Sequence, residues 1–158
     1  RPKGAFLALD LYEQAGLFCG LTLAGATWST PETDRDLLRE RVKGTSVTLL
    51  EDPSDEVIDR LYRKHSVFWN LAGVQGGPPE AFGLAAADAF ASRLTTLAVP
   101  LGGIPEWLTE RFQVSPETIV EVTEAALAEK LPLQTDEEIA KVLPGGFEAA
   151  VVKAGLPW

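Results

Sequence analysis

The sequence predicts an α/β protein with a Rossmann-like, doubly wound and mainly parallel sheet, helices on both faces, and a helical C-terminal tail. Helical and strand-like patterns alternate along roughly the first hundred residues, which is typical of a parallel sheet with right-handed crossovers. After Gly102 and Gly103 the strand pattern ends and only helical patterns remain. We therefore expect one domain over 1–158, with an α/β core over about 1–112 and a helical extension over 113–158.

The opening elements follow from their boundary residues. A first helix begins near Phe6 and ends near Gly16, because glycine is the usual residue at a helix end. The apolar run 17–24 suits a strand buried on both faces. The segment 30–32 (Thr-Pro-Glu) places a capping residue, a proline and an acid in the order of a helix start, and that helix is expected to end at Gly44.

The same reasoning extends along the chain. Ser54, or Asp55 beside it, is expected to cap the third helix, and small residues form a fourth helix from Gly83 to about Ala91. Beyond the core, helices are expected to begin at Ser115 and Thr135, and another to cover 147–152. The remaining apolar runs predict further strands over 47–50, 66–71 and 94–99.

The composition excludes several classes of function. The net charge is −9, with 23% charged and 46% hydrophobic residues, and an acidic chain lacks the basic face that nucleic acid requires. No apolar run approaches the roughly 20 residues of a membrane-spanning helix, so we expect no transmembrane segment and a cytoplasmic protein. No metal-ligand spacing is found, and we expect neither a metal site nor a cofactor.

The loop from Gly73 to Gly83 is the best candidate for a site. Ligands of open α/β sheets bind where strands run into helices. A glycine-rich loop lets backbone N–H groups approach a ligand closely, and this loop leads into a helix whose first amides favour phosphate. On composition alone it predicts an anion or nucleotide site.

Particular residues make the prediction more specific. Residues 80–91 (EAFGLAAADAFA) contain an acid, seven intervening residues and a second acid, with Phe-Gly shortly after the first acid. This segment resembles the donor site of family 4 retaining glycosyltransferases of the GT-B fold. The resemblance continues to residues 102–106 (GGIPE), the second loop of that family. Upstream, 68–73 (FWNLAG) is similar to the Trp-His-x-x-Gly segment of a subgroup, and 2–4 (PKG) is similar to the Lys-Gly that follows the first strand of the family.

The resemblance implies a nucleoside-diphosphate sugar as ligand, bound without a metal. It implies that Glu80 contacts the sugar at the catalytic centre and that Asp88 contacts the ribose. It further implies that the diphosphate is bound by Lys3, by the amides of Phe82, Gly83 and Leu84, and by the turn at Gly102 and Gly103. The chain would then be the donor-binding domain of a longer enzyme whose N-terminal acceptor-binding domain is absent here, and it should be inactive alone.

An alternative interpretation stays open. The chain departs from the family pattern at Asp88, where the family has Glu, and at Asn70, Arg93 and Thr95, where it has His, Gly and Pro. Glu80 could simply complement a helix dipole, and Asp88 could be solvated surface. These departures leave open the alternative of a non-catalytic structural or interaction module that keeps a degenerate glycosyltransferase fold within a larger assembly.

Overall fold

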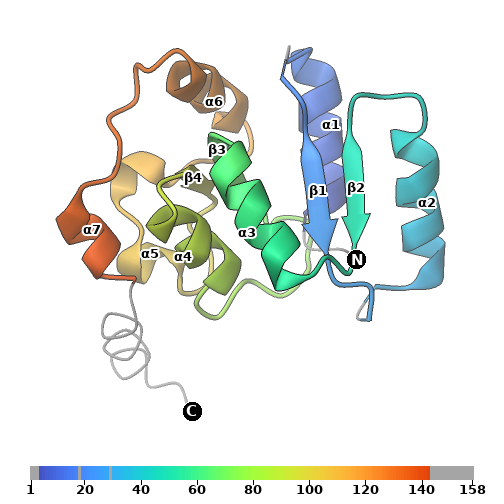
Figure 1. Cartoon of the computed structure of the whole chain (residues 1–158), viewed down its shortest axis with the longest axis horizontal. Helices are drawn as coiled ribbons and strands as arrows, with labels where there is room; N and C mark the ends of the chain where they lie inside the picture. The colour runs from blue at the N-terminus through green and yellow to red at the C-terminus, as the bar shows by residue number, and fades with distance from the viewer. Residues whose placement is uncertain (1–3, 18, 29, 143–158) are drawn as a thin grey trace.

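A computed structural model describes residues 4–17, 19–28 and 30–142 of the chain. These residues form a mixed α/β fold with four short strands, seven α-helices and one 3₁₀ helix (Figure 1). In chain order the elements are α1 (Ala5–Ala15), β1 (Thr22–Gly25), α2 (Glu32–Val42), β2 (Thr48–Glu51), α3 (Asp55–Lys64), β3 (Val67–Asn70), α4 (Leu84–Ala91), β4 (Thr95–Ala98), α5 (Ile104–Trp107), η1 (Glu110–Phe112), α6 (Ile119–Leu127) and α7 (Asp136–Ala140).

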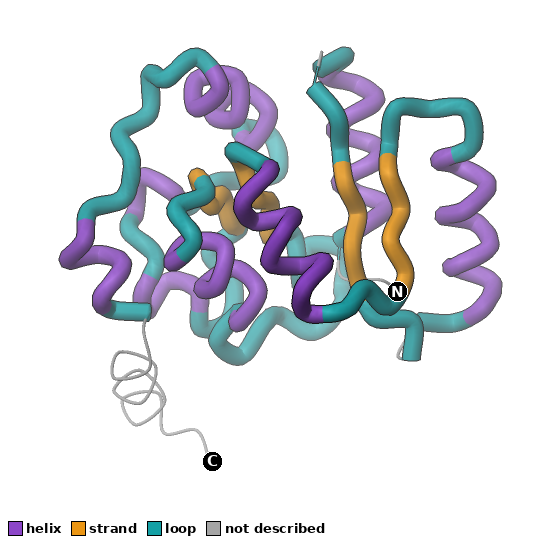
Figure 2. Tube along the Cα trace, in the orientation of Figure 1, coloured by secondary structure: helices purple, strands orange, loops and turns teal. Residues whose placement is uncertain are grey.

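The four strands form two separate parallel pairs. β1 pairs with β2, with Thr22 opposite Thr48, and β3 pairs with β4, with Val67 opposite Thr95. Figure 2 shows the two pairs as distinct units. The prediction of an α/β fold with parallel strands is confirmed. The described residues do not form the single continuous sheet that we predicted, because β1 and β3 do not pair. Apolar patterning predicts that a segment is a strand, but it does not predict which strand lies beside it.

Several helix boundaries agree with the sequence. α1 ends at Gly16, which adopts a left-handed conformation with φ 59°. α7 begins with a complete capping box, in which the side chains of Thr135 and Glu138 each accept from the backbone N–H of the other residue. α2 begins one residue later than predicted: Pro31, and not Thr30, is the N-cap, and no side chain caps the helix.

The first predicted strand is shorter than its apolar run. Only Thr22 to Gly25 lie in β1, whereas the apolar run predicts a strand over 17–24. The hydroxyl of Tyr12 donates to the carbonyl of Cys19 at 2.5 Å, so a backbone acceptor in this run is used by α1 and not by a neighbouring strand. Hydrophobicity alone does not reveal this competition.

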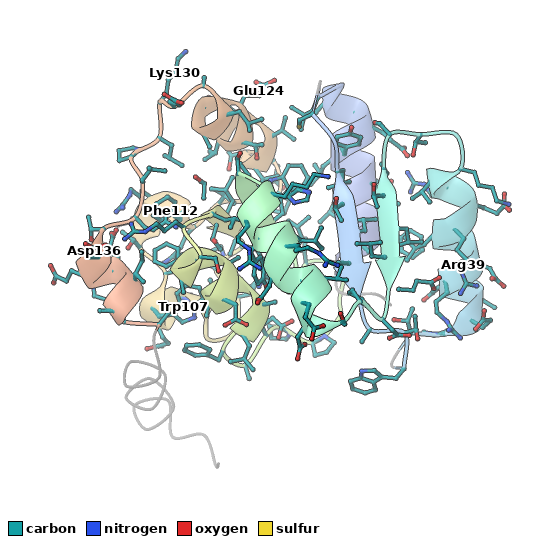
Figure 3. All side chains as sticks on the ribbon, viewed as in Figure 1. Arg39, Trp107, Phe112, Glu124, Lys130 and Asp136 are labelled. Carbon is teal, nitrogen blue, oxygen red and sulfur yellow. The ribbon has the colours of Figure 1, made fainter. Side chains whose placement is uncertain are left out.

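The main core surrounds the β3–β4 pair. Phe90, Phe112, Leu97 and Ile104 are almost completely buried there, and the rings of Phe90 and Phe112 meet edge to face at 5.6 Å. Burial of each such side chain contributes about 1.5–3 kcal/mol. Figure 3 shows Phe112 among the helices of this half of the molecule. A second, smaller cluster lies between α1, α2 and the β1–β2 pair: Leu9, Tyr12, Leu38 and Val47.

The C-terminal extension packs onto the α/β core. The buried side-chain amide of Gln134 donates to the carbonyls of Phe90 (3.0 Å) and Leu94 (2.9 Å). The indole N–H of Trp69 in β3 donates to Thr123 in α6 at 2.8 Å. The helix expected over 147–152 lies outside the described residues. No helix in the described part of the chain is long and apolar enough to cross a membrane.

Candidate functional site

Two loops meet by direct backbone contact at the N-terminus of α4. The N–H of Gly103 donates to the carbonyl of Glu80 at 3.0 Å. A Cβ on Gly103 would overlap the Ala81 carbonyl oxygen, and a Cβ on Gly102 would overlap the Glu80 carbonyl oxygen. Gly102 also has a φ of 62°, which L side chains rarely adopt. The chain therefore needs both glycines to bring the two predicted loops together.

Gly83 connects this junction to the end of β3. It is the N-cap of α4 with φ 84°, and a Cβ here would lie 2.5 Å from Cδ1 of Ile104 and 3.6 Å from Nδ2 of Asn70. The first intrahelical bond runs from the N–H of Ala87 to the carbonyl of Gly83 at 2.9 Å. The amides just before Ala87 have no acceptor within the helix, so the positive end of the helix dipole lies beside the junction.

Phe82 is fixed by packing. Its side chain is buried, its ring centroid lies 5.7 Å from that of Trp107, and its carbonyl accepts a 2.8 Å hydrogen bond from the Trp107 indole. These contacts fix the side chain and the carbonyl of Phe82 at the junction. The exposed neighbour Leu84, by contrast, has 60% of its surface accessible. Figure 3 shows Trp107 beside α4 and α5.

The structure brings five of the predicted residues together at one junction, and Asp88 lies further along α4. Glu80, Phe82, Gly83, Gly102 and Gly103 lie around one junction, as the contacts above show.

Asp88 is partly exposed on the side of α4 that faces α3. Its electrostatic neighbours there are Asp59 and Tyr62, and the Tyr62 hydroxyl donates to the carbonyl of Ala85 at 3.1 Å. Partial burial, and then the charge of Asp59, raise the pKa of Asp88. Burial, and then the charges of the two aspartates, raise the pKa of Tyr62 to about 12. The raised pKa of Asp88 reflects an uncompensated carboxylate at this surface.

The structure also places other residues that the sequence singled out. Glu106 is the third residue of α5. Arg93 occupies the left-handed region with φ 66°, where glycine would be unstrained, and its guanidinium pairs with Asp136 at 2.5 Å. Thr95 is buried in β4. Arg93 therefore lies on the surface and Thr95 in the interior of this part of the fold. Lys3 lies outside the described residues.

Sequence reasoning missed two contributors to the junction. Asn70, which the sequence marks only as a departure from the family pattern, accepts a hydrogen bond from the N–H of Ala72 at 3.1 Å through Oδ1, which shapes the turn after β3. Gly73 has φ 87°, and a Cβ there would lie 3.1 Å from Cα of Pro79. The signal for Gly73 was its place at the start of the glycine-rich loop, where a positive φ is common.

His65 has a structural role. It is the C-cap of α3, its Nδ1 lies 2.9 Å from the Leu61 carbonyl, and its Nε2 lies 3.0 Å from the hydroxyl of Thr22 in β1. Its ring thus links α3 to the first strand pair.

A second polar feature lies after β1 and β2. The Asp52 carboxylate accepts from the backbone N–H of Thr27 at 2.7 Å and from its hydroxyl, and these hydrogen bonds lower the pKa of Asp52. Trp28, in the same loop, has 87% of its surface exposed.

An open groove between α1 and α6, lined in part by Leu7, Leu11 and Val120, contains none of the predicted site residues. Within the described residues, no group of three or more His, Cys, Asp and Glu side chains could hold a metal ion. Comparison of the sequence with models of protein families finds no match, and comparison with curated proteins finds none either.

Proposed function

We propose that this chain is the nucleotide-sugar-binding domain of a retaining glycosyltransferase of the GT-B class. The observation that carries the proposal is the glycine junction, where the Glu80 loop, the Gly102–Gly103 turn and the start of α4 meet. The same proposal includes the finer fold: the two strand pairs are the halves of one doubly wound sheet, and the junction follows β3 and β4 at the carboxyl edge, where such sheets bind ligands.

The diphosphate would be held mainly by backbone. The N–H groups of Leu84, Ala85 and Ala86 have no intrahelical acceptor and point from the positive end of the α4 dipole. An acidic chain can bind an anion this way because the amides supply local positive potential without a basic side chain. Lys3 would add a full positive charge as the diphosphate departs.

The sugar would contact Glu80. Its carbonyl accepts the bond from Gly103, which places the residue at the junction, and a carboxylate there can accept hydrogen bonds from sugar hydroxyls. Transfer would move the sugar from the diphosphate to an acceptor held by a separate domain, and the developing charge on the leaving diphosphate would be stabilised by amides in place of a metal. The chain alone should therefore bind the donor and transfer nothing.

One observation favours the alternative of a non-catalytic module. Asp88, which would contact the ribose, faces Asp59 and Tyr62 of α3. A ribose contact would have to be made from this like-charged surface. If the module has lost its ligand, the glycine junction remains only as a packing device.

Calorimetric titration of the intact chain with uridine and guanosine diphosphates tests the proposal. We expect one of them to bind with a Kd of about 0.1–1 mM, equivalent to about 4–5.5 kcal/mol. Glu80→Gln should weaken the nucleotide-sugar more than the bare nucleotide, because its partner is the sugar.

Glu137→Gln, an acid of the same type on the exposed first turn of α7, is the matched control and should change neither affinity. Absence of binding to either nucleotide at millimolar concentration, with the chain folded, would favour the structural module.

A further inference from the structure

The groove between α1 and α6 is an apolar surface that the described part of the chain leaves uncovered. It has a volume of about 450 Å³ and opens to solvent. Leu7, Leu11 and Ala15 of α1 line one wall, spaced four residues apart and therefore on one face of the helix. Pro116 and Val120, also four residues apart, line the other wall. All of these residues are half-buried, so each keeps apolar surface in contact with water.

The floor of the groove is held in place by the core beneath it. Leu7, Leu11 and Val120 pack against the main hydrophobic cluster, and α1 contacts α6 directly. Leu127, at the end of α6, lies seven residues after Val120 and thus on the same face, and it is 44% exposed. The apolar surface is therefore preformed and extends along α6 for about two turns.

Three carboxylates border this apolar surface on the α6 side. Glu117, Glu121 and Glu124 are exposed and stand four and three residues apart, which places them side by side next to Val120. Within residues 4–17, 19–28 and 30–142, no Lys, Arg or His forms an ion pair with any of them. Figure 3 shows Glu124 directed outward from α6, whereas Lys130, beyond the end of this helix, points away from α1 in that view. The described residues therefore leave the three charges without a counter-charge.

The negative charge is a property of these two helices and does not simply follow from the net charge of −9 of the chain. α6 has two acids and no basic residue, and α1 likewise has two acids and no basic residue. α3, by contrast, has three residues of each sign. On α1, Asp10 and Glu13 share one cation, the Arg41 guanidinium of α2, at 2.8 and 2.6 Å. One of these two negative charges therefore also remains unbalanced.

A helix of a partner protein fits this surface better than an extended segment does. The groove is formed by two helices and the turn before α6, and a helix forms its backbone hydrogen bonds internally. An extended segment would find no strand edge here, so its buried N–H and C=O groups would lack partners. A helix satisfies its own backbone and can place apolar residues at i, i+4 and i+7 in such a groove. The negative rim favours Lys and Arg beside that apolar stripe.

The same charges argue against two other occupants. In a symmetric dimer the groove of one copy would face the groove of the other, and Glu117, Glu121 and Glu124 would meet their own counterparts. An anionic lipid surface attracts basic segments and would be repelled by this rim. A basic helix is the occupant whose charge complements the groove.

We propose that the groove between α1 and α6 is a docking site for a basic amphipathic helix of a partner protein. The apolar face of that helix would lie on Leu7, Leu11 and Val120, and its Lys or Arg residues would face Glu121 and Glu124. No residue of the glycine junction lines the groove, so the inference does not depend on the nucleotide proposal.

The probe is a peptide of about 16 residues, long enough to form a helix on binding, with leucines at i, i+4, i+7 and i+11 and lysines beside them. The matched control peptide has the same leucines and a glutamate in place of each lysine. Each peptide is titrated into the isotopically labelled whole chain at low salt and followed by NMR. We expect the basic peptide to shift the amides of Leu7, Leu11 and Val120 and to bind at least about tenfold more tightly than the acidic one, with a difference that shrinks as salt is added.

Glu121→Lys/Glu124→Lys reverses the charge of the rim and leaves the apolar walls unchanged. Both side chains are exposed, so the fold should be retained, which urea unfolding checks. This variant should bind the acidic peptide more tightly than the basic one, a reversal of the wild-type order. Glu110→Lys/Glu137→Lys changes two exposed acids outside the groove. It alters the net charge equally and should keep the wild-type order.

Equal affinity of the two peptides for the wild type would overturn the proposal, because apolar contact alone would then account for binding. So would shifts that avoid the groove, or no binding of the basic peptide at millimolar concentration. A second copy as the occupant would overturn it as well. Sedimentation would then show a dimer, and its dissociation on dilution would move the amides of Leu7 and Val120.

Discussion

The N–H of Gly103 donates to the carbonyl of Glu80 across two loops that are more than twenty residues apart in sequence. The loops approach so closely because neither Gly102 nor Gly103 has a side chain, and any Cβ would overlap a carbonyl oxygen of the Glu80 loop. Gly103 has an ordinary φ of −85°, so its requirement for glycine is steric alone.

Gly103→Ala should therefore destabilise the protein by about 1–3 kcal/mol, the usual cost of forcing atoms into a packed site. The free energy of unfolding in urea measures it. Gly77→Ala is the matched control: Gly77 lies in the same glycine-rich loop, a methyl group added to it would meet no atom within 4 Å, and its φ is not positive. The control should be neutral or slightly stabilising. An equal loss in both variants would show that the junction is not close-packed.

Trp107→Phe should cost about 1–3 kcal/mol, because it leaves the buried carbonyl of Phe82 without its 2.8 Å donor. Trp28→Phe removes the same indole group from a side chain that is 87% exposed and should change stability by less than about 0.5 kcal/mol. Thermal or urea unfolding of both variants gives the comparison. A neutral Trp107→Phe would mean that the hydrogen bond does not anchor the loop.

Glu138→Gln should lose stability in a pH-dependent way. Hydrogen bonds from Arg111 hold the pKa of Glu138 well below its usual range, aided by the Thr135 N–H and the Thr109 hydroxyl. A lowered folded pKa contributes stability above the unfolded value, about 4.3, and this contribution is lost as the pH falls toward the folded pKa. The variant should be less stable by about 1–3 kcal/mol at pH 7.

The difference between wild type and Glu138→Gln should shrink progressively below about pH 4. Glu137→Gln, on the same first turn of α7 but exposed, should show neither the loss nor its pH dependence. A Glu138→Gln deficit that stays constant from about pH 7 down to about pH 3 would contradict the role assigned to its charge.

Asp88→Asn should act in the opposite direction on stability. Burial and the charge of Asp59 raise the pKa of Asp88, so its ionised form opposes folding once the pH exceeds the unfolded value, about 3.9. The amide should stabilise the fold at pH 7 by less than about 1 kcal/mol, since solvent screens this exposed group, and the gain should vanish in acid. Urea unfolding of wild type and variant, at pH 7 and in acid, measures the difference in stability. A loss of stability at pH 7 in the variant would contradict the account.

The same substitution separates the two proposed roles of the protein. If Asp88 contacts a ribose, Asp88→Asn should gain stability and lose nucleotide affinity together. A gain without any loss of affinity would leave Asp88 as surface charge only.

The sequence predicted the elements better than their assembly. Gly16, Thr135 and the spacing of apolar residues defined helix ends and strands because these signals act locally. The pairing of β1 with β2, and the lack of pairing between β1 and β3, depend on contacts between distant segments that no local pattern encodes.

The site was predictable to a similar degree. The glycine-rich loop and Gly102–Gly103 indicated close backbone approach, and the structure places them together. The position of Asp88 toward α3 was not predictable, because it depends on how α4 is rotated against Tyr62 and Asp59.

A titration of the isotopically labelled chain with uridine and guanosine diphosphates, followed by NMR, tests the central claim most directly, because it reports both affinity and location. We predict that Leu84, Ala85, Ala86, Gly102 and Gly103 shift together with one apparent Kd of about 0.1–1 mM, while amides of α7 do not move. No shift at the glycine junction at millimolar nucleotide, or shifts confined to another surface, would contradict the account.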